Sequence, residues 1–223
     1  KKENFNLYLN TKNFDRISKA FFNSSTSMVS QAEWMQWDVD LSDEGILFSG
    51  ISLSHDSLAQ ELSFYEGNDA HATIAPSVLP RNTALFITKS FENFQQFKRK
   101  QISSNSIQQN KYAKKLLGLN SDLLQTFNSW IDSEITWFTA ENSSTISEGM
   151  VVHITDEVEV ENFIAERADS IVVYRDKTIY DWNDLKHFSA ICFTELKEEP
   201  QYAIVLEEQL ILSSDLSLLK NIL

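Results

Sequence analysis

The chain contains few of the residues that form covalent cross-links, tight loops and phosphate-binding turns. Its 223 residues include one cysteine, three prolines and five glycines, and no two glycines are adjacent. A single cysteine excludes a disulfide within the chain, and scattered glycines exclude a glycine-rich phosphate loop. The sequence also lacks the G-x-S-x-G pattern of serine hydrolases. These features remove several common enzyme classes from consideration.

Long apolar runs are missing as well. No segment approaches the roughly 20 apolar residues that span a bilayer as a helix, so we expect no transmembrane segment. The chain starts with Lys-Lys-Glu, without a methionine or a signal-peptide pattern, and we expect it to be a piece of a longer protein. With 42% hydrophobic residues, it can bury a core without cross-links.

Basic residues are scarce over most of the chain. The formal net charge is −13, which argues against nucleic acid as a general partner. Residues 21–80 include nine acids and no lysine or arginine. Residues 81–121, by contrast, carry eight basic residues against one acid, a net charge of +7. The sequence therefore predicts an acidic body with one basic arm.

Six clustered cations of this arm form the main candidate site. They are Lys98, Arg99, Lys100, Lys111, Lys114 and Lys115. We predict that they form one exposed face that binds an anionic partner, either an acidic protein or an anionic membrane surface. The alternative is a solvated pair of helices whose charge balances the acidic surface of the protein itself.

The segment Pro76–Phe97 predicts a strand, a cap and a helix in succession. Residues 83–88 are rich in β-branched and apolar side chains, which favours a strand. Ser90 is a good N-cap residue. Three phenylalanines follow at a spacing of three, which places them on one face of a helix.

The same order of signals recurs after the predicted strands at Phe5–Leu9 and at Gly149–Ile154. We therefore predict an α+β fold with mostly antiparallel sheets and helices packed on one face. The recurrence indicates a duplicated strand–cap–helix module. We expect a single domain over residues 1–223, with two related halves at about residues 1–78 and 79–223. The alternative is that such junctions occur in any α+β chain.

Hydrophobic periodicity predicts the other elements. Further strands are expected at 32–41, 46–53, 134–139, 170–174, 178–182, 188–196, 202–206 and 209–212. Further helices are expected at 10–22, 107–117, 121–131, 158–168 and 216–223.

Side chains that could hold a metal or act as nucleophiles are present but poorly spaced. The acidic run from Asp38 to Gly45 lacks the ligand spacing of a calcium loop and is more typical of a hairpin. No two histidines are four residues apart, and none neighbours the cysteine. Cys192 lies between apolar residues, which favours a buried position. We predict no catalytic residue, no metal site and no cofactor.

The five tryptophans allow two interpretations. Trp34, Trp37, Trp130, Trp137 and Trp182 could line a groove for a carbohydrate or a peptide. Alternatively they pack in the core, which fits the positions of Trp37 and Trp137 on the apolar faces of their predicted strands.

Three segments together resemble a known family. They are VLPRNTALFITKSFENFQQFKR, WIDSEITWFT and PQYAIVLEEQLILSSDLSLLKNIL. They are similar to an uncharacterised domain of large, exported or lipid-anchored Bacteroidetes envelope proteins. The resemblance covers Trp34–Gly50, Leu79–Phe97, Trp130–Ile135 and Pro200–Leu219. The chain is shorter than that family around Tyr180–Leu196.

The resemblance implies a bacterial envelope location, in the periplasm or at the outer membrane, and no chemistry. We therefore expect a non-enzymatic domain that binds or scaffolds within a larger lipoprotein, with another envelope protein or an anionic membrane surface as partner. The alternative is a carboxylate-based hydrolase or glycan-active enzyme, which needs two carboxylates about 5–10 Å apart in one pocket. A purely structural spacer is the third interpretation.

Overall fold

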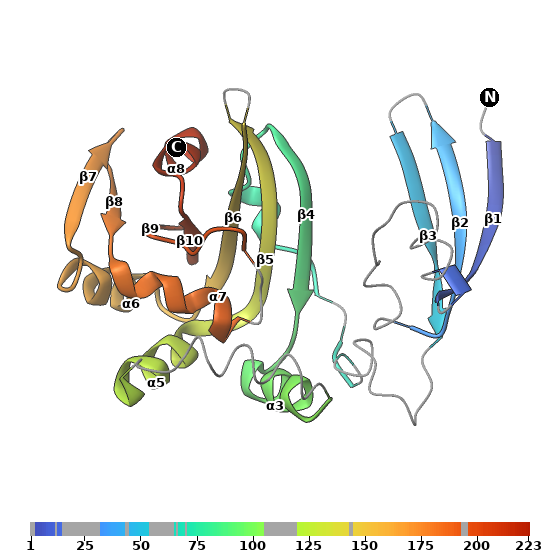
Figure 1. Ribbon diagram of the computed structural model, residues 1–223, viewed down its shortest axis with the longest axis horizontal. Coiled ribbons are helices and arrows are strands. Elements are labelled where there is room, and N and C mark those ends of the chain that lie inside the picture. Colours follow the sequence, from blue (N-terminus) through green and yellow to red (C-terminus); the bar gives the residue numbers. More distant parts are fainter. Residues whose placement is uncertain are drawn as a thin grey trace. The chain divides into compact units, whose positions relative to one another are not determined.

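The computed structural model divides the chain into two compact units (Figure 1). One unit comprises residues 1–67 and 99–105, and the other comprises residues 68–98 and 106–223. The structure describes residues 3–11, 13–14, 32–42, 45–53, 65, 67–69, 71–104, 120–142, 145–192 and 196–223. The predicted relation between two halves of the sequence stays a prediction.

The first unit contains a three-stranded antiparallel sheet. Its strands are β1 (Glu3–Asn10), β2 (Trp34–Ser42) and β3 (Gly45–Leu53), in the order β1-β2-β3. Met35 and Val39 are buried on one face of β2, while Asp38 between them is exposed. This alternation is that of a strand with one wet face. The hairpin predicted for the acidic run is confirmed by the β2–β3 pairing.

The second unit is built on a seven-stranded antiparallel sheet in the order β4-β5-β6-β10-β9-β8-β7. Its strands are β4 (Thr83–Ser90), β5 (Ile131–Asn142), β6 (Thr145–Ile154), β7 (Ser170–Tyr174), β8 (Lys177–Asp181), β9 (Tyr202–Leu206) and β10 (Gln209–Ser213). Its α-helices are α5 (Ser121–Trp130), α6 (Glu157–Ala165), α7 (Phe188–Ile191) and α8 (Leu216–Ile222), together with the first part of α3 (Phe94–Ser104), whose residues from Arg99 on belong to the first unit. Two 3₁₀ helices, η2 (Ala75–Ser77) and η3 (Asn183–His187), complete it.

Two of the hairpins in this sheet close with two-residue turns. Arg175 and Asp176 join β7 to β8, and Glu207 and Glu208 join β9 to β10. All four residues have positive φ angles, between 49° and 63°. A turn with two such residues matches the right-handed twist of the strands that it connects. The strands predicted at 170–174 and 178–182 are confirmed, and the turn at Arg175 and Asp176 joins them into a hairpin.

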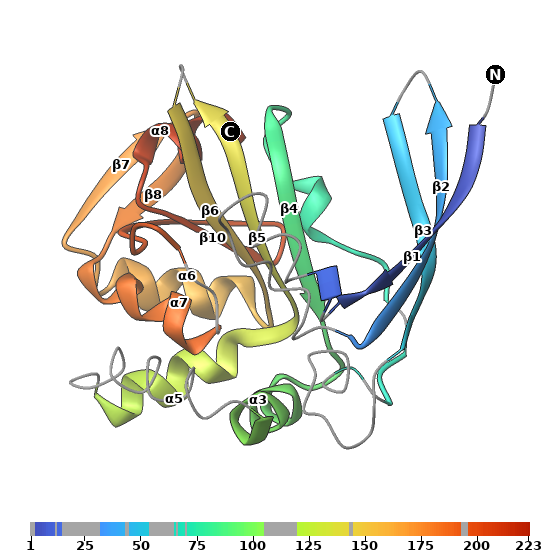
Figure 2. The ribbon, with the colours of Figure 1, turned by 45° about the vertical axis from the view of Figure 1, so that its right-hand side comes forward.

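The α+β class with antiparallel sheets is confirmed, but helices cover both faces of the larger sheet and not one face as predicted. On one face, Val151 and Ile211 pack in a cluster with Leu218 and Leu219 of α8. The neighbouring positions of β6 and β10, which face the other way, are also buried. On that side α6 contacts β9. Figure 2 shows α6 and α7 close together, with α8 apart from them. Central strands that are apolar on both faces require this double cover.

The phenylalanines at the start of α3 form the expected packed group. The ring centroids of Phe91 and Phe97 are 4.9 Å apart, and those of Phe91 and Phe94 are 5.4 Å apart. The helix starts at Phe94, three residues after Phe91, and the Asn93 side chain accepts a hydrogen bond from the Gln96 amide. The prediction of Ser90 as the cap is therefore wrong, because Ser90 is the last residue of β4.

The strand predicted at 188–196 is also wrong. Residues 183–187 form η3 and residues 188–191 form α7. Leu185, Phe188 and Ile191 are fully buried, and their spacing of three is that of a helix face. The helix predicted at 121–131 is confirmed, with Asn120 as its N-cap. The helices predicted at 10–22 and 107–117 lie largely outside the described residues.

Candidate functional site

The structure describes half of the predicted basic patch. Arg99 is exposed on α3, and Lys100 is half-buried. Lys98 is half-buried and points toward α5. Lys111, Lys114 and Lys115 lie outside the described residues. Whether all six cations share one exposed face stays a prediction, but Lys98 belongs to a groove of its own.

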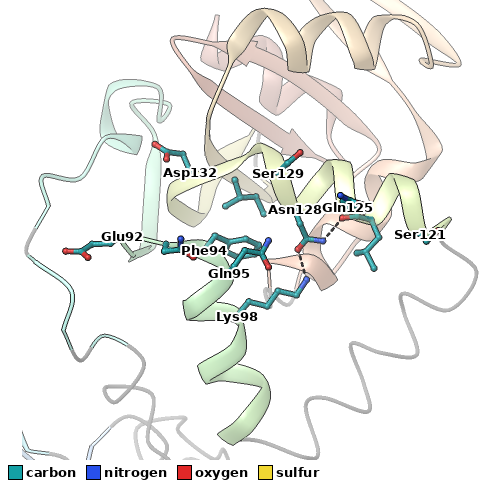
Figure 3. A pocket seen from close by; sticks show the side chains of 12 residues that line it. Glu92, Phe94, Gln95, Lys98, Ser121, Gln125, Asn128, Ser129 and Asp132 are labelled. Carbon is teal, nitrogen blue, oxygen red and sulfur yellow. Dashed lines mark hydrogen bonds between the residues drawn. The ribbon is translucent and has the colours of Figure 1, made fainter.

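This groove lies between α3 and α5 and has a volume of about 620 Å³ (Figure 3). Lys98 donates a hydrogen bond to Asn128 Oδ1, with 2.5 Å between the nitrogen and the oxygen. The Asn128 amide in turn donates to the Leu124 carbonyl, which fixes its orientation. The Phe94 ring lies below the ammonium, with its centroid 6.0 Å from Nζ. The groove therefore has an apolar floor and a row of polar side chains.

Lys98 is electrostatically unusual within this groove. Burial lowers the pKa of its ammonium, and the nearby Cys192 opposes this effect. No carboxylate in the described part of the chain pairs with Lys98. The two carboxylates that line the groove have other partners: Glu92 accepts from the Asp69 amide, and Asp132 lies 3.0 Å from His153 Nδ1. The cation is therefore partly desolvated without a compensating charge.

His153 joins a polar cluster that the sequence did not reveal. Its Nδ1 lies 2.8 Å from Ser133 Oγ and 3.0 Å from Asp132 Oδ2, and its Nε2 lies 4.0 Å from Glu208 Oε2. The hydroxyl and the nearer carboxylate thus share one ring nitrogen. A serine–histidine–acid triad has the hydroxyl and a hydrogen-bonded carboxylate on opposite nitrogens. Glu208 lies on the nitrogen opposite Ser133, but 4.0 Å is beyond hydrogen-bond distance, so this cluster does not have triad geometry. A register shift in β5 between Ile131 and Ile135 brings Asp132 and Ser133 to this position.

A second pocket, of about 430 Å³, contains carboxylates. Glu148 Oε2 accepts from the Lys197 amide at 2.8 Å, and Glu148 Oε1 lies 3.6 Å from Lys197 Nζ. Asp215 caps α8 by accepting from the Ser217 amide, and it also accepts from the Ser147 hydroxyl. Each carboxylate oxygen of Glu148 and Asp215 therefore has a structural contact.

The remaining polar and aromatic candidates are mostly structural. Cys192 is buried as predicted, and burial raises the pKa of its thiol. Trp130 and Trp182 are buried in an aromatic cluster with Phe127 and Phe188. Trp34 is exposed on β2, so the core interpretation does not hold for every tryptophan.

In the part of the chain that the structure describes, β4 is an apolar edge strand of the larger sheet. It pairs there only with β5, and Leu85, Phe86 and Ile87 at its centre are 50%, 45% and 53% exposed. Successive residues of a strand point to opposite faces, so apolar side chains are exposed on both sides of β4. No charged residue or proline lies between Thr83 and Thr88. The sequence predicted this strand but not its place at the edge.

Comparisons with protein-family models, curated proteins and solved structures find no match for the chain. The resemblance to the Bacteroidetes envelope domain therefore stays a prediction. Site arguments rest on the geometry of the chain itself.

Proposed function

We propose that the chain is a non-enzymatic binding module that docks an extended segment of another protein along β4. The observation that carries the proposal is the run of exposed apolar residues at Leu85, Phe86 and Ile87 on an edge strand. Edge strands that remain single are normally protected by charges, prolines or bulges within the strand. The centre of β4 has no charge and no proline; its register irregularity lies at its start, between Thr83 and Leu85, and its one charge, Lys89, lies near its end.

An added strand would pair with the free backbone groups of β4 and would cover its exposed apolar side chains. Every second residue of an antiparallel edge strand directs its N–H and C=O groups away from its neighbour, where a partner strand can pair with them. Such a partner would also cover Phe86 on one face of the sheet and Leu85 and Ile87 on the other. We expect the partner segment to be apolar at its centre, because cross-strand apolar pairs stabilise a sheet.

The partner is a different protein and not a second copy of this chain. The formal net charge of −13 makes two copies repel each other at close approach. Repulsion of this kind is screened by salt with a Debye length of about 8 Å at physiological ionic strength. A short segment of another protein avoids most of this cost.

We further propose that the module belongs to a larger lipid-anchored protein of a bacterial envelope, as the sequence resemblance implies. In the part of the chain that the structure describes, no helix is long and apolar enough to cross a membrane. Cell fractionation of the full-length protein tests the location. We expect it in the envelope fraction, and recovery in the cytosol would contradict this part of the proposal.

Selection from a library of short random peptides displayed on phage tests the binding function. We expect the wild-type chain to enrich peptides with an apolar centre. Ile87→Lys, at the exposed edge, should weaken binding of a selected peptide by about tenfold or more, which corresponds to roughly 1.4 kcal/mol.

The matched control is Ile171→Lys, which changes an isoleucine that is 59% exposed on β7, at the opposite edge of the sheet. It should leave peptide binding unchanged. Equal loss in both variants, or no enrichment, would overturn the proposal. A wild-type dimer that Ile87→Lys converts to a monomer would identify a second copy as the occupant instead.

The pocket at Glu148 and Asp215 favours the alternative of a carboxylate-based hydrolase, because three carboxylates, those of Glu148, Glu198 and Asp215, line one hollow. The existing contacts of Glu148 and Asp215 with Lys197, Ser147 and Ser217 argue against this use. We expect no release of reducing sugar ends from bacterial cell-wall polysaccharides. A release that Glu148→Gln abolishes would establish the enzyme.

A further inference from the structure

In the groove between α3 and α5, the carboxylates have contacts elsewhere in the chain, whereas Lys98 has no carboxylate partner among the described residues. Its carboxylates, Glu92 and Asp132, are engaged with the Asp69 amide and with His153. Figure 3 shows Glu92 directed away from Lys98. Among the described residues that line the groove, Lys98 is the one cation. Lys98 therefore places a positive charge in the groove, while Glu92 and Asp132 bring the formal charge of this lining to −1.

Desolvation of a cation is costly unless an opposite charge or several acceptors compensate it. Lys98 has one acceptor in the described part of the chain, Asn128 Oδ1, and an ammonium group can donate three hydrogen bonds. The Phe94 ring adds only a weak attraction at 6.0 Å. The lysine therefore keeps donor capacity for a group that enters the groove.

The amide side chains around Lys98 fit an oxyanion. Gln95 on α3 and Gln125 on α5 line the groove and are exposed, and neither side chain has a hydrogen-bond partner among the described residues. Their NH₂ groups can donate to an oxygen that is bound at Lys98. The volume of about 620 Å³ falls within the range of pockets for small organic ligands.

We propose that this groove binds a small organic molecule through a carboxylate group, which pairs with Lys98 and accepts hydrogen bonds from Gln95 and Gln125. One fixed cation matches the single charge of a carboxylate. A phosphate monoester carries nearly two charges at neutral pH, and the described residues that line the groove include no second cation. The apolar part of the ligand lies against Phe94.

Two-dimensional amide NMR of the whole chain, titrated separately with acetate, succinate and benzoate, tests the proposal. At least one of these carboxylates should shift the resonances of α3 and α5 in a saturable way. Benzamide, which has the shape of benzoate without its charge, should not. Phenyl phosphate should bind more weakly than benzoate.

Lys98→Met should weaken carboxylate binding by about tenfold or more, equivalent to roughly 1.4 kcal/mol. Arg99→Met is the matched control, because Arg99 is the exposed neighbour on α3 and does not line the groove. It should bind as the wild type does. The amide spectrum of each variant shows directly whether it is folded.

Three results would overturn the inference: no saturable shift with any carboxylate, equal binding by Lys98→Met, or tighter binding of benzamide or phenyl phosphate than of benzoate. The inference is independent of peptide docking along β4. Peptide binding by Ile87→Lys and carboxylate binding by Lys98→Met are separate measurements, so either proposal can fail without the other.

Discussion

Two buried or partly buried ionisable side chains of the second unit, Glu134 and Lys98, differ in how many hydrogen-bond partners they have. Glu134 is almost completely buried, and its carboxylate accepts hydrogen bonds from the backbone amides of Ile74 and Ala75 and from Thr136. The hydrogen bonds from Ile74 and Ala75 attach the start of η2 to β5 of the sheet. Lys98, in contrast, has one acceptor and no carboxylate partner among the described residues. The first arrangement is typical of a structural group, and the second is typical of a binding group.

Glu134→Gln should lower the free energy of unfolding by about 1–3 kcal/mol. The substitution replaces one accepting oxygen with an NH₂ group, which then faces a backbone N–H donor. Urea unfolding measures the effect. Glu141→Gln, on the exposed end of the same strand, is the control and should change stability little. Equal effects of the two substitutions would show that the Glu134 contacts contribute nothing.

Lys98→Met should be more stable than the wild type at pH 7, and this advantage should shrink toward about pH 10. Burial lowers the pKa of Lys98 in the folded state, so the folded protein binds fewer protons than the unfolded chain between the two pKa values. Between these two pKa values, the free energy of unfolding of the wild type therefore rises with pH, while that of Lys98→Met does not rise from this cause. Urea midpoints of both proteins at several pH values measure it. A stability difference between the two proteins that does not change with pH would contradict a lowered pKa of Lys98 in the folded state.

At the scale of elements, the packing of β5 on β6 depends on a missing side chain. Gly149 lies opposite Phe138, which is fully buried. A Cβ atom at position 149 would lie 2.4 Å from the Phe138 ring. The ring therefore covers the glycine, and the two positions are matched in size.

Gly149→Ala should destabilise the chain by about 1–3 kcal/mol, because the buried ring has to move. Thermal unfolding followed by circular dichroism measures the loss. Ile146→Ala, on the same strand and 67% exposed, is the comparison. A neutral Gly149→Ala would show that Phe138 has room to shift.

Local patterns in the sequence predicted most strands and hairpins of the second unit, because alternation and turn residues are properties of neighbouring residues. The helix predicted at 121–131 was recognisable in the same way, from the periodicity of its apolar residues. The wrong prediction of a strand at 188–196, where the structure has α7, also comes from relying on local patterns. A short apolar run fits a strand or a buried helix equally well. The pairing of Lys98 with Asn128 and the edge position of β4 depend on residues far apart in the chain. No local signal encodes them.

At the scale of the whole molecule, the seven-stranded sheet is complete within residues 83–213. Its core cluster includes Ala75 and Val78 from η2 and its flank, and Leu218 and Leu219 from α8. A fragment of residues 68–223 therefore contains every strand of the larger sheet and this cluster.

We expect this fragment to fold without residues 1–67 and to unfold cooperatively in urea. Near-ultraviolet circular dichroism of its tryptophans reports on fixed packing. A fragment with far-ultraviolet signal but no near-ultraviolet signal would contradict the expectation, since it would have secondary structure without a packed core.

Amide hydrogen exchange tests the docking of a peptide segment along β4 most directly. In the free chain, the outward-facing amides of residues 83–88 should exchange fast, as those of an unpaired edge do. In complex with a selected peptide, the same amides should become protected, while β7 at the opposite edge should not change. Protection confined to β7, or a complex without protection of β4, would contradict the account.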